Sequence, residues 1–275
     1  MFEKVNPSHP DKIADRIAGA IVDLAYLKAK NPKVAVEVLL GHGHCKCFIE
    51  SSLSFEYYEI NQIVERICDK VKLELISTKQ DSHLAQNQEK LRCGDNGIFK
   101  GSPITKEQQL LANISLDIYQ KYPFDGKYII KENTSTHQYD VTICQSHLLD
   151  SNKLEIENYL RDKDIYGKII INPLGEWLGG IDVDCGATNR KLGSDMGDGI
   201  TGGGLHGKDL SKSDVSVNIW CFLQAKKQCK DVLTSCSIGD EFVNGIPYEM
   251  IVNEAKQYID SIGGFEKFAE WGLIR

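Results

Sequence analysis

Hydrophobic residues near the N-terminus follow first a helical and then a strand spacing. Residues 11–30 place isoleucine and alanine on one face at the helical period, which predicts an amphipathic helix. Pro10 fits the first position of that helix, where its missing N–H is harmless. Residues 34–40 alternate valine with other residues, and residues 45–51 follow after two glycines. These two stretches predict a pair of strands joined by a turn.

The spacing of hydrophobic residues changes between the helical and the strand pattern several more times along the chain. It predicts further helices at 57–75, 108–119, 154–161, 211–228 and 247–262, and further strands at 127–130, 139–144, 168–172 and 230–239. Pairs of strands beside single helices predict an α+β fold, with helices on one face of mostly antiparallel sheets. The 275 residues fit three units of about 90 residues each. We place an N-terminal region at 1–78, a central domain at 79–166 and a C-terminal domain at 167–275.

Composition is that of a globular protein with no general affinity for nucleic acid or membranes. Hydrophobic residues make up 41% of the chain and the net charge is −7, so we expect no nucleic-acid partner. The longest apolar runs are too short to span a bilayer, and the first residues lack the apolar core of a signal peptide. The nine cysteines are odd in number and scattered, which favours a reduced, cytoplasmic protein over a disulfide scaffold.

One segment has the residue types of a metal site but not the spacing. His42, His44, Cys45 and Cys47 stand closer together than the paired ligands of a zinc site, and no second pair follows at the usual interval. We therefore expect a turn entering a strand here rather than a zinc site.

Two segments predict functional loops. Residues 80–98 are polar with weak periodicity, and residues 179–209 are rich in glycine, aspartate and basic residues. Glycine lets backbone N–H groups approach a ligand, arginine and lysine neutralise phosphate, and aspartate serves Mg²⁺. The second loop therefore predicts a phosphate site, with a solvated loop of mixed charge as the alternative.

The end of this second loop has the outline of a known phosphate-binding motif. Gly202, Gly207 and Lys208 match the G-x-x-x-x-G-K pattern, but Asp209 replaces the hydroxyl residue that should bind Mg²⁺. The residues before Gly202 do not predict the strand that such a loop follows. We therefore expect a phosphate site of another design.

A second candidate constellation lies at the start of the first predicted helix. His9 could donate to a phosphate and Asp11 could bind Mg²⁺, at a helix N-terminus that attracts anions. Read alone, these residues indicate a helix start more than a binding site.

Both constellations belong to a series of segments that occur in a fixed order. They are HPDKIADRI (9–17), VAVE (34–37), FIESS (48–52), KQDSHLAQ (79–86), CGDNGIF (93–99), FDGKYII (124–130), TICQSH (142–147), INPLGEWLGGIDVDCGATNRK (171–191) and GGGLHGKDLSKSD (202–214). Together, and in this order, they resemble the S-adenosylmethionine synthetase (methionine adenosyltransferase) family. The order of the segments makes the resemblance specific.

The resemblance implies a fold and a reaction. The fold would be three small α/β-sandwich-like domains related by pseudo-threefold symmetry, reduced in the C-terminal part. The enzyme would join ATP to L-methionine by attack of the sulfur on ribose C5′, and would then hydrolyse the triphosphate to phosphate and diphosphate. A neutral thioether needs no general base, so positioning and stabilisation of the triphosphate are the tasks. The family uses Mg²⁺ and K⁺ and builds its active sites between subunits, which implies a homodimer that could pair into tetramers.

The resemblance also implies roles for individual residues. The catalytic groups around the phosphates would be His9, Lys127, Arg190, Lys191 and Lys208. The nucleotide contacts would be Asp125, Trp177, Asp184 and Ile238. The methionine contacts would be Glu50, Gln80, Asp184 and Lys212, although Lys212 could belong to the phosphate cradle instead. The metal ligands would be Asp11 and Asp214 for Mg²⁺ and Glu37 for K⁺.

Departures from the family pattern keep other interpretations open. Glu176 stands where the family has arginine, Asn96 stands where it has glutamine, and the chain and its two loops are shorter. A non-catalytic binding or regulatory relative is therefore the main alternative to an enzyme. A kinase with a phosphate loop is a third interpretation, which would release ADP rather than triphosphate fragments.

Overall fold

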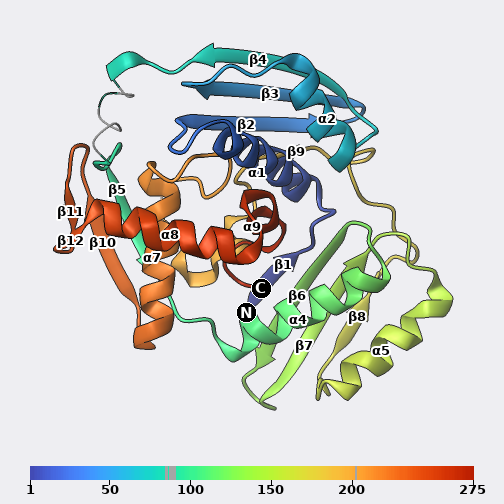
Figure 1. Ribbon diagram of the computed structural model, residues 1–275. Coiled ribbons are helices and arrows are strands. Elements are labelled where there is room, and N and C mark those ends of the chain that lie inside the picture. Colours follow the sequence, from blue (N-terminus) through green and yellow to red (C-terminus); the bar gives the residue numbers. More distant parts are fainter. Residues whose placement is uncertain (84–85, 87–90, 202) are drawn as a thin grey trace.

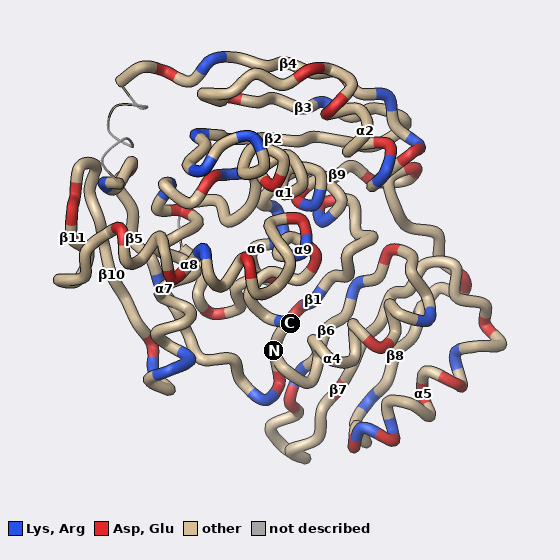
Figure 2. The backbone as a smooth tube through the Cα atoms, viewed as in Figure 1, with Lys and Arg blue, Asp and Glu red and all other residues tan. Residues whose placement is uncertain are grey.

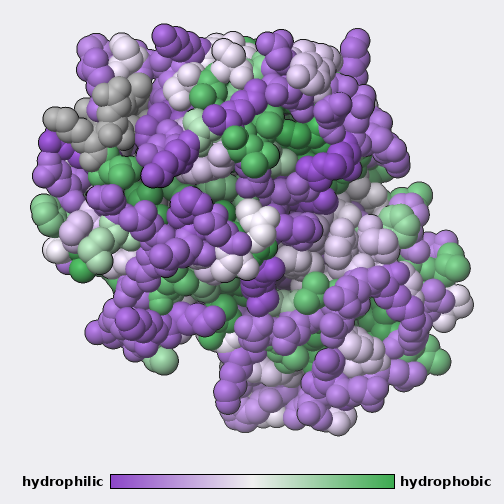
Figure 3. All heavy atoms as spheres, in the orientation of Figure 1, coloured by the Kyte–Doolittle hydropathy of each residue, from purple (hydrophilic) through white to green (hydrophobic). Residues whose placement is uncertain are grey.

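The computed structural model describes residues 1–83, 86, 91–201 and 203–275. It has an α+β fold with two four-stranded and two two-stranded sheets among these residues (Figure 1). Gly202 and six residues of the predicted loop at 80–98 lie outside the described part. No helix in the described ranges has the length and apolar character needed to cross a membrane. The face viewed in Figure 3 is mostly hydrophilic, with hydrophobic side chains in small groups.

The first sheet carries the N-terminal hairpin and has the order β4-β3-β2-β9. Its strands are β2 (Val34–Gly41), β3 (His44–Ser51), β4 (Lys72–Lys79) and β9 (Gly186–Ala187). Helices α1 (Pro10–Lys28) and α2 (Tyr57–Ile67) share a hydrophobic core with its inner face. Cys45 and Cys47 point into that core and His44 points outward, so the expected turn and strand are confirmed and these residues do not converge on an ion.

The second sheet has the order β1-β6-β7-β8. Its strands are β1 (Phe2–Val5), β6 (Gly126–Asn133), β7 (Gln138–Gln145) and β8 (Ile169–Ile171). Helices α4 (Lys106–Lys121) and α5 (Lys153–Asp162) cover it, and all share a second core (Figure 1). Strand β1 pairs with β6, so the N-terminus completes a sheet from the middle of the chain.

A smaller unit contains strands and helices from the C-terminal part. Strand β5 (Gly97–Gly101) pairs with β10 (Val232–Cys236), and β11 (Phe242–Val243) pairs with β12 (Ile246–Pro247). Helices α7 (Ser213–Gln228) and α8 (Tyr248–Ile262) pack beside them. The short helix α6 (Leu192–Met196) lies against β1, and α9 (Phe265–Trp271) packs on α1 at the centre of the molecule (Figure 1).

Two predictions about individual elements are wrong. The helix predicted at 57–75 ends at Ile67, where Cys68 turns extended and buries its side chain, and β4 begins at Lys72. The end of the predicted loop at 80–98 enters β5, which pairs with a strand more than a hundred residues away. The sheets are mostly antiparallel, as expected, with parallel pairs only at β3–β4 and β7–β8 in the described part. The pseudo-threefold relation and the domain boundaries stay predictions.

Candidate active site

The start of α1 presents His9 in an uncharged form. His9 is the N-cap, and its Nδ1 accepts a hydrogen bond from the backbone N–H of Asp11 (3.1 Å). The proton therefore sits on Nε2, which is buried and has no hydrogen-bond partner. Burial, helped by Lys127 and Lys191, lowers the pKa of His9 to about 3, so the ring is neutral at pH 7. A buried N–H without a partner can donate to a ligand oxygen.

Asp11 joins the start of α1 to the segment that follows β9. One of its carboxylate oxygens accepts from the backbone N–H of Ala187 (2.9 Å), and the other lies 3.2 Å from Lys191 Nζ. Arg190 lies 3.6 Å away and is 58% exposed, so its guanidinium can reach a ligand. A side chain at Gly186 would place its Cβ 2.1 Å from the Pro10 carbonyl oxygen, so only glycine allows this approach.

The start of β6 adds a second carboxyl group and a third basic side chain. Lys127 Nζ lies 3.9 Å from Asp184, and both side chains are about half exposed. Asp125 accepts from the Gly180 backbone N–H (2.9 Å) through one oxygen, while its other oxygen is buried without a partner. Burial raises the pKa of Asp125 to about 6. An unpartnered, desolvated carboxyl oxygen is a binding group for a ligand hydroxyl or amino group.

Trp177 lies beside Asp125, a residue that lines a cleft. A Cβ on Gly179 would stand 2.4 Å from the Trp177 ring and 2.6 Å from Asp125, which shows how closely the two side chains flank that glycine. A cleft of about 340 Å³ opens next to Asp125 and Gly180. An aromatic ring beside a polar group in a cleft suits a planar ligand with polar edges. We call His9, Asp11, Asp125, Lys127, Trp177, Asp184, Arg190 and Lys191 the first cluster.

Lys208 and Asp214 form a second cluster. Lys208 Nζ lies 2.5 Å from Asp214, and both side chains are partly exposed. The loop before them lies on the edge of β2, because Lys208 bridges Ala35 and the Gly207 carbonyl accepts from Val36 N–H (2.7 Å). Asp209 is buried and accepts from the backbone N–H of Val34 (2.9 Å), so it braces this loop instead of facing a ligand. Lys212 is the N-cap residue of α7, whose first turn contains Asp214.

Asn189 holds the two clusters at fixed positions within one chain. Its backbone N–H donates to Asp15 on α1 (2.8 Å), and it precedes Arg190 and Lys191 of the first cluster. Its side-chain oxygen accepts from the N–H groups of Leu205 and His206 (both 2.8 Å), just before Lys208. No hydrogen bond or ion pair within the described residues joins the first cluster directly to Lys208 or Asp214. The sequence did not predict the role of Asn189. In the structure its φ is positive (62°), a conformation in which asparagine is enriched.

The remaining predicted residues lie on β2 and β3, after β4 and after β10. Glu37 and Glu50 project from the exposed face of β2 and β3, where Glu37 contacts the Thr188 hydroxyl. Gln80 is buried after β4, with its backbone N–H on the Ser51 carbonyl (3.1 Å). Ile238 is 51% exposed, and its N–H donates to Asn96 Oδ1 (2.8 Å). Acidic and basic positions are interspersed along the chain, so the basic groups gather only locally (Figure 2).

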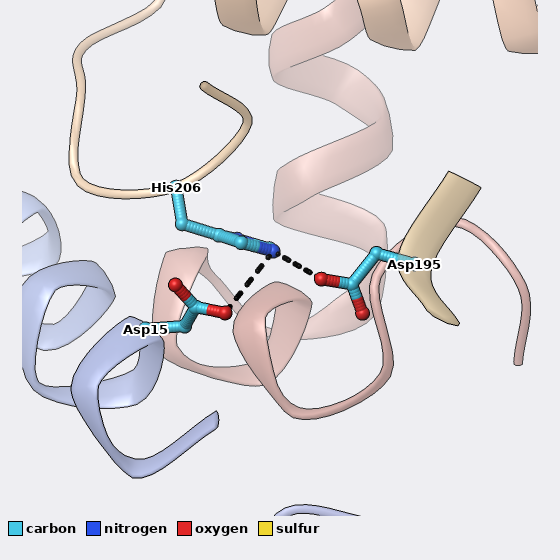
Figure 4. Close-up of side chains that lie close together, drawn as sticks. All are labelled: Asp15, Asp195 and His206. Atoms are coloured by element: carbon cyan, nitrogen blue, oxygen red, sulfur yellow. Dashed lines mark hydrogen bonds and ion pairs between the residues drawn. The ribbon is translucent and has the colours of Figure 1, made fainter. Parts of the chain in front are cut away.

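A buried charged network, missed by the sequence analysis, lies one turn beyond Asp11. Lys12 Nζ is 2.6 Å from Asp195 and 3.2 Å from Asp15. His206 Nε2 is 2.9 Å from Asp195, and Asp15 lies on the other side of the ring nitrogen (Figure 4). Asp15, Asp195 and His206 are close enough to hold a metal ion, but the Lys12 ammonium group already contacts both carboxylates. Burial alone would lower the pKa of Lys12, yet Asp195 and Asp15 raise it, so the lysine stays charged.

Comparisons with known proteins identify the relatives of this chain. Residues 1–91 match the family model for the N-terminal domain of S-adenosylmethionine synthetase. An S-adenosylmethionine synthase from Mycoplasma capricolum is 24% identical over 92% of this chain and 77% of its own length. One from Helicobacter pylori strain J99 is 27% identical over 78% of this chain and 69% of its own length. The first 91 residues thus match this family, and relatives named S-adenosylmethionine synthase resemble most of the chain.

A solved structure has the same fold as this chain. The structure of an unusual S-adenosylmethionine synthetase from Campylobacter jejuni superposes with a TM-score of 0.73, covering 99% of this chain and 94% of that one. At 17% identity this likeness concerns the fold alone. The segments that carry His9, Asp11, Glu37 and Glu50 all lie within the part that the family model matches.

Proposed function

We propose that this chain synthesises S-adenosylmethionine from ATP and L-methionine and hydrolyses the triphosphate to phosphate and diphosphate. The observation that carries the proposal is the first cluster, in which basic side chains and carboxyl groups gather near an uncharged His9. Such a group of donors fits a polyphosphate, whose negative charge grows as it leaves C5′. The neutral methionine sulfur needs no base, and none of these side chains has to remove a proton.

Each charged residue of the first cluster has a task in this reaction. Lys127, Arg190 and Lys191 would bind the phosphate oxygens, and His9 Nε2–H would donate to the oxygen next to C5′. Asp125 and Trp177 would hold the nucleoside, with the ring against adenine and the carboxyl oxygen toward its polar edge. Trp177 takes the place of an aromatic residue of the family pattern.

The carboxylates fit the cations that the family uses. Mg²⁺ takes one or two carboxylates together with phosphate oxygens, and Asp11 and Asp214 each offer one carboxylate beside a lysine. When Lys191 and Lys208 turn to the phosphates, these carboxylates become available. Bound Mg²⁺ would neutralise the leaving triphosphate. Glu37, on the open face of β2, would hold K⁺.

The two clusters share no direct hydrogen bond or ion pair within the described residues, which fits active sites shared by two copies of the chain. The outer face of β2, β3 and β4 exposes Leu39 (52%), Phe48 (41%) and Ile76 (55%), and Glu37 is the cross-strand neighbour of Phe48. Because large apolar side chains on an open sheet face favour burial, a second copy of this face is the proposed occupant. In such a homodimer Lys208, Lys212 and Asp214 of one chain would complete the first cluster of the other. Glu50 and Gln80 would contribute to methionine binding there.

Incubation of the purified chain with ATP, L-methionine, Mg²⁺ and K⁺ tests the function. Chromatography should show S-adenosylmethionine, and equal amounts of phosphate and diphosphate should appear with it. Asp11→Asn should lower turnover by about a hundredfold or more, because it removes a charge next to the leaving group. Asp162→Asn, on the exposed end of α5, is the matched control and should keep full turnover.

The products distinguish the remaining interpretations. ADP without triphosphate fragments would indicate a kinase and contradict the proposal. A folded, dimeric chain that binds ATP yet forms no S-adenosylmethionine would instead support a non-catalytic relative. We place either activity in the reduced cytoplasm, because all nine cysteines are free thiols.

A further inference from the structure

The segments 93–97 and 236–240 are bound to each other at the end of the β5–β10 pair. Cys93 N–H donates to the Asp240 carbonyl (2.9 Å), and Gly239 N–H donates to the Cys93 carbonyl (2.8 Å). Cys236 is the cross-strand partner of Gly97. These contacts bring Cys93 and Cys236 together, although they are 143 residues apart in the sequence.

The two thiols form a close, buried pair. Their sulfur atoms lie 3.2 Å apart, with Cys93 fully buried and Cys236 4% exposed. A disulfide needs a sulfur separation of about 2.05 Å, so an approach of about 1.2 Å is enough to bring the sulfurs to bonding distance. The Cys93 thiol now donates to the Asp95 carbonyl (2.9 Å), and neither sulfur belongs to the proposed active site.

We propose that Cys93 and Cys236 are an oxidation site that closes to a reversible intramolecular disulfide. The oxidant is a small disulfide of the glutathione type. The Cys93 thiolate attacks one sulfur of that disulfide, whose S–S bond breaks and releases one thiolate. The deprotonated Cys236 then attacks the Cys93 sulfur of the mixed disulfide and expels the second thiolate. Two electrons and two protons pass from the protein to the small disulfide, which balances the reaction.

The surroundings of the pair determine which of the two thiols ionises first. A hydrogen bond from Cys236 lowers the pKa of Cys93 to about 7, helped by the Asp95 backbone and the Ser213 hydroxyl. The same hydrogen bond raises the pKa of Cys236, so one proton is shared and Cys93 ionises first. A thiol whose pKa is close to the ambient pH is the best attacking group in exchange. Because Cys93 is buried, attack requires the 93–97 segment to open, and exchange should be slow.

The disulfide would lie beside two parts of the proposed active site. Ile238, the expected adenine wall, lies two residues from Cys236 and is bound to Asn96. Ser213, which contributes to the pKa of both thiols, precedes Asp214 at the start of α7. Oxidation also removes the donor of the Asp95 carbonyl. We therefore expect the oxidised chain to turn over more slowly, an effect that rests on the proposed function.

The test uses the full chain with the two exposed cysteines, Cys185 and Cys229, replaced by serine. The reduced protein is kept for a day at pH 7 in mixtures of reduced glutathione and glutathione disulfide. It is then denatured, alkylated and mapped by mass spectrometry without reduction. The expected result is a cross-link between the peptides of Cys93 and Cys236 that dithiothreitol removes. A further Cys236→Ser change should leave Cys93 as a glutathione adduct, and a further Cys144→Ser change should leave the cross-link intact.

Two results would overturn the inference. One is that both thiols are alkylated in the most oxidising mixture, and the other is a stable glutathione adduct on Cys93 while Cys236 remains a thiol. The cross-link is read without any turnover, so it stands or fails independently of the proposed enzyme. If the chain makes S-adenosylmethionine, turnover should fall on oxidation, recover with dithiothreitol and be insensitive to oxidation once both Cys93 and Cys236 are serine.

Discussion

Two inactive variants of this chain should restore activity when they share a dimer. Asp11→Asn damages the first cluster, where the carboxylate lies 3.2 Å from Lys191. Lys208→Ala damages the second cluster, where the ammonium lies 2.5 Å from Asp214. Since no contact joins these groups within the described part of one chain, each active site should combine the first cluster of one copy with the second cluster of the other. Each variant alone should then lose about a hundredfold or more in turnover.

The symmetry of a dimer determines how much activity returns. A mixed dimer has one site with both changes and one site with neither. If chains exchange freely at equal amounts, half of the dimers are mixed and about a quarter of all sites are intact, so about a quarter of wild-type turnover should return. Sites built within a single chain would give no recovery, since every chain carries one change.

The assay is subunit exchange with two affinity tags. Mixed dimers are isolated through both tags, which proves exchange, and S-adenosylmethionine formation is measured on them. Asp11→Asn mixed with Lys191→Ala is the matched control, because both changes damage the first cluster and no arrangement of chains restores it. Mixed dimers of Asp11→Asn and Lys208→Ala that stay as inactive as this control would refute the composite site, and so would a chain that remains monomeric at assay concentration.

Four smaller changes probe the residues that hold the site. Burial raises the pKa of Asp125 to about 6, so ionisation of this carboxyl group destabilises the unliganded chain as pH rises from about 4 through 6. Asp125→Asn should therefore raise the free energy of unfolding at pH 7, measured by urea titration, by about 2–3 kcal/mol, although it should lower turnover. The pKa of His9 is lowered to about 3, so its contribution to stability is present above about pH 6.5 and is lost as pH falls toward 3. His9→Gln should therefore reduce the fall in the free energy of unfolding between about pH 6.5 and about pH 3. Lys12→Met leaves two buried carboxylates without their cation and should lower the free energy of unfolding by about 3–5 kcal/mol. The control Lys28→Met, at the exposed pair with Glu59, should lower it by less than about 1 kcal/mol. If a chelator lowers the melting temperature of the wild type, a metal ion shares the network and this reasoning fails. Asn189→Ala removes three hydrogen bonds to Leu205 and His206 and should lower the free energy of unfolding by about 2–3 kcal/mol. A decrease below about 0.5 kcal/mol would show that the turn before Lys208 is stable without Asn189.

Local signals in the sequence predicted the elements that are decided locally. Helix α1 has a continuous apolar face and a proline at its first turn, and the structure places it at Pro10–Lys28. The stretch 57–75 shows why other predictions failed. Ile67, Val71 and Leu75 have the spacing of a helix, yet Val71, Leu73 and Leu75 have equally the spacing of a strand. Parallel pairing of β4 with β3 decides between them, and no window of the sequence contains that partner.

The candidate site was predictable only in part, for a similar reason. The types of residue at 9–11, 184–191 and 208–214 indicate phosphate and magnesium chemistry, and the family resemblance places them in one reaction. Which of them meet within a chain depends on tertiary contacts such as that between Asp11 and Lys191. Lys12 and Asp15 have the spacing of an ordinary helical ion pair, which gave no sign that Asp195 and His206 complete a buried network.

That network explains how a shorter chain can still position the first cluster. Asp11 and Asp15 lie one turn apart on α1, and they bind the backbone N–H groups of Ala187 and Asn189 (2.9 and 2.8 Å). The spacing of a rigid helix is thereby transferred to the segment that carries Arg190 and Lys191. Burying charged groups is costly, so Lys12 must remain to neutralise Asp15 and Asp195. A change in this network should therefore displace Arg190 and Lys191, the proposed phosphate contacts, and should reduce turnover and stability together.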